Sequence, residues 1–225
     1  ACRFIGLFTS SVFNQNPAEI PVVQGKIAYI FDQMGLSSES HKGRELARIV
    51  EILPREELFQ AETEELRSMV ERIYSLQERR IVRVIVRQDK SGHFVNCLVY
   101  APRDTYDTAL RLKIQDLLSR RFDAASIDFS TFFSESALIR IHFVLKVNEG
   151  TQVSFDSDEL EQTIAGYTRS WEDDLRSVLI TQQGSEQGEV TFDEVKNLFP
   201  PGYKHDYWPA TAYGDIEFIL GLSEQ

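Results

Sequence analysis

The most regular alternation of apolar and polar residues lies between residues 82 and 147, and it predicts β-strands. Valines at positions 82, 84 and 86 alternate with Arg83 and Arg87, which is the period-two pattern of a half-buried strand. Residues 89–92 end in glycine and suit a hairpin turn. The return strand, 93–101, is apolar on both faces, which indicates a central strand or one that is covered on both sides.

Two more strands and two helices complete this block. Strands are predicted over 125–133 and 138–147, and amphipathic helices over 105–121 and 158–181. The resulting order, β-β-α-β-β-α, becomes the ferredoxin-like order when its first strand is moved to the end. We therefore predict an α+β fold, a permuted ferredoxin-like, four-stranded antiparallel sheet with two helices on one face. The other face is expected to be mixed in polarity and free for a partner, with residues Arg83, Ile85, Arg87, Arg140, His142 and Val144.

A helical segment is predicted to precede this sheet. The apolar residues 4–12 predict a strand that ends an earlier domain. Periodic apolar residues then predict helices over 20–34, about 40–53 and 63–76, with a short helical turn over 55–59. Gly35 and Pro54 end the first two helices. Three apolar stripes need a surface to pack against, and the adjoining sheet is the nearest one.

The pattern divides the chain into three parts. Residues 1–78 hold the end of a preceding domain and the helical segment, residues 79–182 hold the ferredoxin-like domain, and residues 183–225 hold a linker and a C-terminal helical tail. The polar stretch 182–187, with glycines around it, is the predicted linker. The tail is expected to have a short acidic helix, a Pro-Pro-Gly break, an aromatic patch and a final amphipathic helix.

Composition and charge exclude several classes of protein. The chain has 225 residues and a net charge of −11, so it lacks the basic surface expected of a nucleic-acid binder or of a protein attracted to anionic membranes. Apolar runs are too short for a membrane helix. Only Cys2 and Cys97 are present, which argues against a disulfide framework and favours the cytoplasm. The chain does not begin with methionine, and we expect it to be an excised fragment.

No catalytic, cofactor-binding or metal-binding motif is recognisable. No two glycines are separated by a single residue, so a dinucleotide fingerprint is excluded. The four histidines are scattered, without the spacing of metal ligands. Cys97 alternates with valines and is expected to be a small core residue rather than a nucleophile.

Six polar residues are candidates for binding an effector or forming an interface. Arg83 and Arg87 could bind a carboxylate, although such residues more often protect a sheet edge. Arg103 and Asp104 follow Pro102 at a helix N-terminus, where an anion could bind, although a plain capped turn is the favoured alternative. Arg140 and His142 lie on the mixed sheet face, where His142 could meet an anionic ligand but is more often solvated or at an interface.

Several stretches, in order along nearly the whole chain, resemble the large bacterial NAD-specific glutamate dehydrogenases. They comprise Gly6-Leu-Phe-Thr-Ser-Ser-Val-Phe-Asn14, Pro54-Arg-Glu-Glu-Leu-Phe-Gln60, Cys97-Leu-Val-Tyr-Ala-Pro-Arg103, Arg140-Ile-His142, Arg169-Ser-Trp-Glu-Asp-Asp-Leu175 and Pro209-Ala-Thr-Ala212, with shorter matches between them. Lys90, Ser91 and residues 182–188 depart from the family pattern.

The resemblance implies a regulatory region that lies before the catalytic domain and contains ACT-type modules, which are ferredoxin-like. The parent enzyme would convert L-glutamate, NAD and water to 2-oxoglutarate, ammonia and NADH. Its catalytic lysine and NAD site belong to a later part, so no catalytic residue or cofactor is carried over and this fragment alone is expected to be inactive. Expected partners are the rest of the enzyme chain, further copies in a homo-oligomer and an amino-acid effector.

Two alternatives remain open. The region could be a purely structural oligomerisation scaffold that binds no ligand, which a lack of ligand-dependent stabilisation would favour. It could also be an independent enzyme that uses Cys97 or His142, which activity of the isolated chain would favour.

Overall fold

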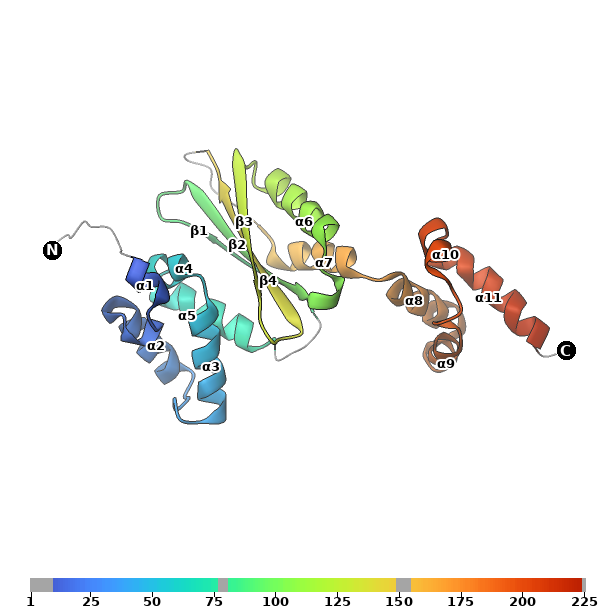
Figure 1. The fold of residues 1–225 in the computed structure, drawn as a ribbon, viewed down its shortest axis with the longest axis horizontal. Helices are drawn as coiled ribbons and strands as arrows, with labels where there is room; N and C mark the ends of the chain where they lie inside the picture. The colour runs from blue at the N-terminus through green and yellow to red at the C-terminus, as the bar shows by residue number, and fades with distance from the viewer. Residues whose placement is uncertain (1–9, 77–80, 149–154, 224–225) are drawn as a thin grey trace.

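The computed structural model describes residues 10–76, 81–148 and 155–223 and has three parts in chain order (Figure 1). A group of helices packs on one face of a four-stranded sheet, two helices cover the other face, and a second group of helices extends from one end of the sheet. Each part has its own cluster of buried apolar residues. The chain therefore consists of an N-terminal helical segment, a central sheet domain and a C-terminal helical segment.

The N-terminal segment contains α1 (Ser10–Asn14), α2 (Pro21–Gln33), α3 (His41–Ile52), α4 (Arg55–Gln60) and α5 (Thr63–Tyr74). The helices predicted from periodicity are confirmed. Gly35 ends α2 with a φ of 62°, which favours glycine, and the Ser40 side chain accepts a hydrogen bond from Gly43 N at the start of α3. The N-cap of α5 is Glu62, which forms a capping box with Glu65.

The strand predicted over residues 4–12 is wrong where it can be assessed. Residues 10–12 belong to the helix α1, and residues 4–9 lie outside the described part of the chain. Val12 packs against the apolar cluster of the helical segment. A short apolar run fits either a strand or a helix, so its periodicity could not decide between them.

The central sheet contains β1 (Arg83–Gln88), β2 (Phe94–Pro102), β3 (Ser126–Phe133) and β4 (Leu138–Lys146), all antiparallel, in the order β1-β2-β4-β3. The predicted α+β fold with a four-stranded antiparallel sheet is confirmed, and the central position predicted for β2 is correct. A short 3-10 turn, Arg103–Thr105, follows β2. The helix α6 (Thr108–Arg121) then begins at Asp107, whose side chain accepts a hydrogen bond from Leu110 N.

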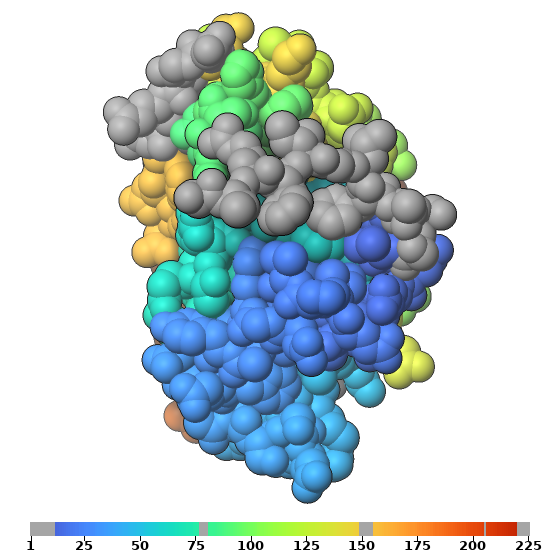
Figure 2. Space-filling view, turned by 90° about the vertical axis from the view of Figure 1, so that its left-hand side faces the viewer, coloured from blue at the N-terminus to red at the C-terminus, as the bar shows by residue number. Residues whose placement is uncertain are grey.

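Both faces of the sheet are covered (Figure 1). The helices α6 and α7 (Ser157–Thr168) cover the face that carries Val99, Ile141 and Phe143. The other face carries Ile85, Leu98, Tyr100 and Leu138, which belong to the same buried cluster as α2–α5. In Figure 2 the blue and cyan residues of the N-terminal segment fill much of one side of the molecule.

The expectation that the mixed sheet face is free for a partner is therefore wrong. Its members Arg87, Arg140 and His142 are at most 9% exposed. The apolar stripes of the N-terminal helices require burial, and the apolar residues interspersed on this face provide the surface for it.

The C-terminal segment begins at a break that the sequence pattern did not predict. The single helix expected over 158–181 is two helices, α7 and α8 (Trp171–Gln183), separated at Arg169 and Ser170. Ser170 and Asp173 form a capping box that starts α8. The apolar stripe continues in phase across the break, which is why periodicity alone predicted one helix.

The polar stretch 182–187 does not form an extended linker. Gly184, with a φ of 85°, joins α8 directly to α9 (Ser185–Val195), and the two helices pack together. The helices α10 (Pro201–Asp206) and α11 (Pro209–Ser223) follow. Leu175, Leu179, Val195, Ala212 and Ile216 form the buried centre of this segment.

Candidate functional site

A buried ion pair joins the N-terminal helical segment to the sheet. Glu57, on α4, is fully buried and accepts hydrogen bonds from Arg87 Nε at 2.6 Å and from Arg87 Nη2 at 2.9 Å. Burial by itself would lower the pKa of Arg87, but the hydrogen bonds and charge of Glu57 raise it overall. Gln60 accepts a further bond at 3.3 Å. The two-point contact fixes the position of α4 on the sheet.

His142 lies beside this pair and is held by a neighbouring strand. Its Nε2 is 3.2 Å from Asn96 Oδ1 on β2, and the ring is only 7% exposed. Because an amide oxygen only accepts hydrogen bonds, Nε2 carries the proton in this contact. The pKa of His142 is lowered, chiefly because the ring is buried. The negative charges of Glu57 and Glu56 act against this shift. The positive charges of Arg140 and Arg87 add to it. His142 is therefore a neutral part of the interface near pH 7.

We expect His142 to make the protein less stable as the pH falls. Its pKa in the folded state lies below the value of about 6.5 for an unfolded chain. The unfolded state therefore binds more protons below that pH, and the free energy of unfolding falls by at most about 1.4 kcal/mol per pH unit. Urea denaturation at about pH 7.5 and about pH 5.5 measures this change. In His142→Gln the free energy of unfolding should fall less between these two pH values. An equal fall in both proteins would show that His142 is not the source of the pH dependence.

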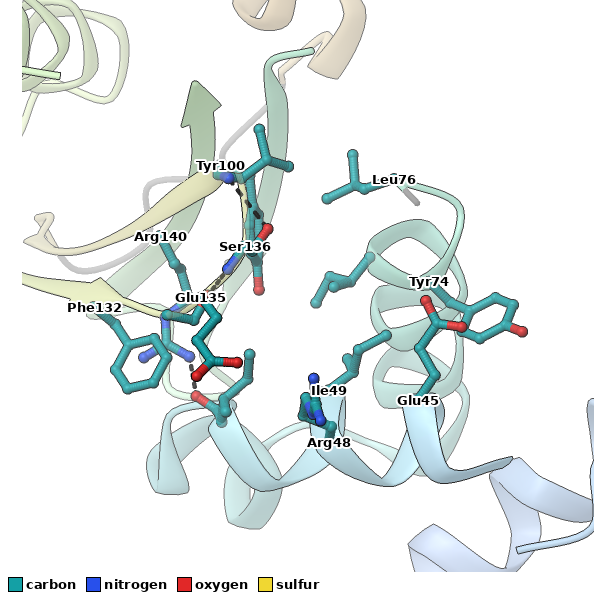
Figure 3. Close-up of a pocket in the computed structure, with 14 residues that line it drawn as sticks. Glu45, Arg48, Ile49, Tyr74, Leu76, Tyr100, Phe132, Glu135, Ser136 and Arg140 are labelled. Atoms are coloured by element: carbon teal, nitrogen blue, oxygen red, sulfur yellow. Dashed lines mark hydrogen bonds between the residues drawn. The ribbon is translucent and has the colours of Figure 1, made fainter. Parts of the chain in front are cut away.

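A cavity of about 500 Å³ opens between α3, α5 and the sheet (Figure 3). Its apolar wall includes Ile49, Ile52, Ile73, Leu76 and Leu138. Figure 3 shows Tyr100, Arg140 and Glu135 reaching toward it from the sheet side, while Glu45 and Arg48 rise from α3. This size and a mainly apolar wall with a few polar groups are typical of small-molecule sites.

Two buried polar atoms at this cavity lack hydrogen-bond partners among the described residues, namely Tyr100 Oη and Arg140 Nε. Arg140 does donate through Nη1 to the carbonyl of Ile52, and its guanidinium lies 4.8 Å from the ring centroid of Phe132. Burial raises the pKa of Tyr100 to about 12, with the nearby Arg140 acting in the opposite direction. An unmet buried hydroxyl costs about 1–3 kcal/mol, so native proteins contain few of them.

Arg83 is placed apart from the other arginines of the sheet. Its Nη1 donates to Glu161 on α7 at 3.0 Å. The same carboxylate accepts bonds from Arg72 on α5 at 2.9 Å and from Val84 N at 3.0 Å, while Arg72 also donates to Val84 O. Glu161 thus links the N-terminal segment, the edge of β1 and α7.

Arg103 and Asp104 lie in the turn between β2 and α6. Arg103 Nη1 donates to Ser134 O at 3.2 Å, and its guanidinium lies 5.7 Å from the ring centroid of Phe133. The helix α6 is capped by Asp107, three residues after Asp104. The structure therefore brings together Arg87, Arg140 and His142 under the N-terminal helices, but it separates Arg83 and the Arg103–Asp104 turn from them.

Sequence reasoning missed Glu57, Glu161, Tyr100 and Arg48. The two glutamates resemble solvent-exposed acids in the sequence, and Tyr100 fits the apolar pattern of a covered strand, so none gave a distinguishing signal. Cys97 is completely buried, and burial raises the pKa of its thiol, which agrees with the predicted core role. In the described ranges, no cluster of metal-ligating residues occurs and no helix is long and apolar enough to cross a membrane.

Three family models match consecutive parts of the chain. Glutamate dehydrogenase helical motif 1 matches residues 20–79, the ACT2 domain of glutamate dehydrogenase matches residues 83–172, and its helical motif 2 matches residues 178–222. The chain is homologous to a segment of the large NAD-specific glutamate dehydrogenases. The resemblance found in the sequence motifs is confirmed.

Relatives with the name NAD-specific glutamate dehydrogenase align with almost the whole chain. The Pseudomonas aeruginosa enzyme is 42% identical over 224 residues, covering 100% of this chain, and the Halomonas elongata enzyme is 38% identical over 222 residues, covering 99%. The Mycobacterium tuberculosis enzyme is 29% identical over 234 residues, also covering 99%. The chain spans 14% of the length of each relative.

The buried contacts of Arg87 and Arg140 thus lie where glutamate dehydrogenase helical motif 1 meets the ACT2 domain. Helical motif 1 contributes α2–α5, and the ACT2 domain contributes the sheet with α6 and α7. The cavity is formed by the same two units.

Proposed function

We propose that this chain is a non-catalytic regulatory and assembly region of an NAD-specific glutamate dehydrogenase. The full-length enzyme would oxidise L-glutamate with NAD and water to 2-oxoglutarate, ammonia and NADH in the cytoplasm, with its NAD site elsewhere in the chain. The homology to a segment of such enzymes and the ACT2 match support this proposal. The partners would be the rest of the enzyme, other copies of it and an amino-acid effector.

The two edges of the sheet differ in a way that supports assembly. The outer edge of β1 is closed, because Val84 N donates to Glu161 and Val84 O accepts from Arg72. Both partners belong to helices packed beside the strand. Bonds of this kind prevent a further strand from pairing there.

The outer edge of β3 is open, and this observation carries the proposal. In the ranges that the structure describes, no group from outside the sheet hydrogen-bonds to Ser126–Phe133. Phe129, Phe132 and Phe133 are 46%, 36% and 51% exposed. An exposed apolar edge strand is a template for pairing with another sheet. We propose that β3 joins the sheet of another copy of the enzyme.

We expect a charged replacement on β3 to weaken assembly of the full-length enzyme. In Phe133→Lys, lysine would remove apolar surface from the strand contact and place a charge there, which disfavours strand pairing. Mass photometry across a dilution series should show dissociation into smaller species at roughly ten-fold higher protein concentration than for the unmodified enzyme. Leu112→Lys, at a 50% exposed position on α6, is the matched control and should leave the assembly unchanged. Equal assembly of both variants and the unmodified enzyme would refute the role of β3.

The alternative is a structural scaffold that binds no effector. The closed β1 edge and the buried Arg87–Glu57 pair would suit a rigid scaffold equally well. The two versions differ in whether a small molecule changes glutamate-dependent NADH formation by the full-length enzyme. A regulatory region predicts such a change, and a scaffold predicts none.

A further inference from the structure

The cavity between α3, α5 and the sheet has the features of a built ligand site. It lies at the junction of two structural units, and its volume of about 500 Å³ fits a small organic molecule. Tyr100 is only 5% exposed, lines the cavity and has a hydroxyl without a hydrogen-bond partner among the described residues. The neighbouring Arg140 interacts with this hydroxyl but can only donate hydrogen bonds, so the proton of the Tyr100 hydroxyl remains available for a bound acceptor.

The charges around the cavity favour an acid. Arg140 is 9% exposed and has an Nε without a partner among the described residues, while the guanidinium of Arg48 approaches from α3 at the rim (Figure 3). The hydroxyls of Ser134 and Ser136 also line this end, where both accept bonds from backbone amides and can still donate their own protons. Two guanidinium groups and three hydroxyls thus line the same cavity, which suits a carboxylate.

The rest of the wall favours a short aliphatic body. Ile49, Ile52, Ile73, Leu76 and Leu138 provide it, from both helices and from the sheet. Glu45 and Glu135 at the opening could in addition bind an ammonium group. The shared chemistry is therefore a carboxylate on a branched aliphatic chain, with or without an α-amino group.

We infer that this cavity binds a short aliphatic carboxylic acid, with its carboxylate between Tyr100, Arg140 and Arg48. The inference rests on the proposed regulatory function and deepens it. The ligand would contact helical motif 1 and the ACT2 domain simultaneously, so binding would fix the position of one unit on the other. A ligand that prefers one arrangement of two units shifts their equilibrium toward it.

The test is isothermal titration calorimetry of the 225-residue chain with leucine and, separately, with 4-methylpentanoate. These acids share the aliphatic body, and only leucine has the α-amino group. We expect saturable binding of at least one of them. The dissociation constant should be about ten-fold higher, or more, in Tyr100→Phe and in Arg48→Gln. Tyr100→Phe should fold at least as well as the unmodified chain, because it removes an unmet buried hydroxyl.

Matched controls come from residues of the same types away from the cavity. Tyr106→Phe and Arg44→Gln, the latter on the same helix as Arg48, should bind the acid as the unmodified chain does. If leucine binds more tightly than 4-methylpentanoate, its ammonium group is bound by the glutamates at the opening. If the two acids bind equally, the α-amino group makes no contribution and the polar recognition comes from the carboxylate alone. Absence of binding by both acids, or binding unchanged in Tyr100→Phe and Arg48→Gln, would overturn the inference. Because binding is measured on this chain, that result would leave the β3 assembly test on the full-length enzyme unaffected.

Discussion

Replacing Glu57 by glutamine should lower the free energy of unfolding by about 3–5 kcal/mol. Glu57 is fully buried, and Arg87 is 7% exposed. Removing the carboxylate charge leaves the guanidinium buried without its counter-ion, and a buried charge of this kind is costly. Urea denaturation followed by circular dichroism near pH 7 measures the change. The loss should also appear as faster hydrogen exchange in α4, which this pair attaches to the sheet.

An exposed ion pair provides the matched control for this prediction. Asp116 and Arg120 on α6 form a pair at 2.9 Å, but their side chains are 58% and 79% exposed. Asp116→Asn should therefore cost no more than about 0.5 kcal/mol. The double replacement Glu57→Leu with Arg87→Met removes both charges and should recover most of the stability that Glu57→Gln loses. Similar costs for Glu57→Gln and Asp116→Asn would show that burial does not govern the strength of the Arg87 pair.

Replacing Gly188 by alanine should disrupt the helical hairpin of α8 and α9. An added Cβ at this position would lie 2.6 Å from Ile180 Cα and 2.7 Å from Ile180 N. These are backbone atoms of the facing helix and cannot rotate away, so the helices must separate and loosen their contacts at Leu175, Leu179 and Val195. Overpacking of this kind costs about 1–3 kcal/mol or more. Thermal unfolding and hydrogen exchange in α8 and α9 measure the effect.

Gly166 is the control, because it also lies inside a helix but has open space around it. Among the residues that the structure describes, no atom outside its own stretch of helix would lie within 4 Å of a Cβ at this position. Alanine has the higher helix propensity, so Gly166→Ala should stabilise the protein by about 0.5–1 kcal/mol. If alanine destabilises the protein at position 188 and stabilises it at position 166, the close contact between α8 and α9 is the cause of the destabilisation. Stabilisation by alanine at both positions would contradict the close packing of α8 on α9.

Local chemistry along the chain was sufficient to predict most of the helices and strands. Alternating valines predicted β1, a run that is apolar on both faces predicted the central strand β2, and Gly35 marked the end of α2, as the structure confirms. The break before α8 was harder, because the apolar stripe continues across it. Its signal was the capping box of Ser170 and Asp173, which depends on two polar residues rather than on periodicity.

The candidate site could be predicted only in part. Arg87, Arg140 and His142 were recognised as members of one sheet face, because side chains two residues apart on a strand point the same way. Their partners were not predictable. Glu57 lies 30 residues from Arg87 in sequence, and Ile52 lies 88 residues from Arg140.

Residues close together in the chain were sufficient to show which face of each helix and strand is apolar and which family the chain resembles. What covers each face became known only from the folded chain. The packing of the helical segment on the sheet converted a face expected to be free into a buried interface, paired Glu57 with Arg87 and enclosed the cavity at Tyr100. Periodicity states that a surface must be buried, but the partner that buries it is chosen by contacts between residues far apart in the chain.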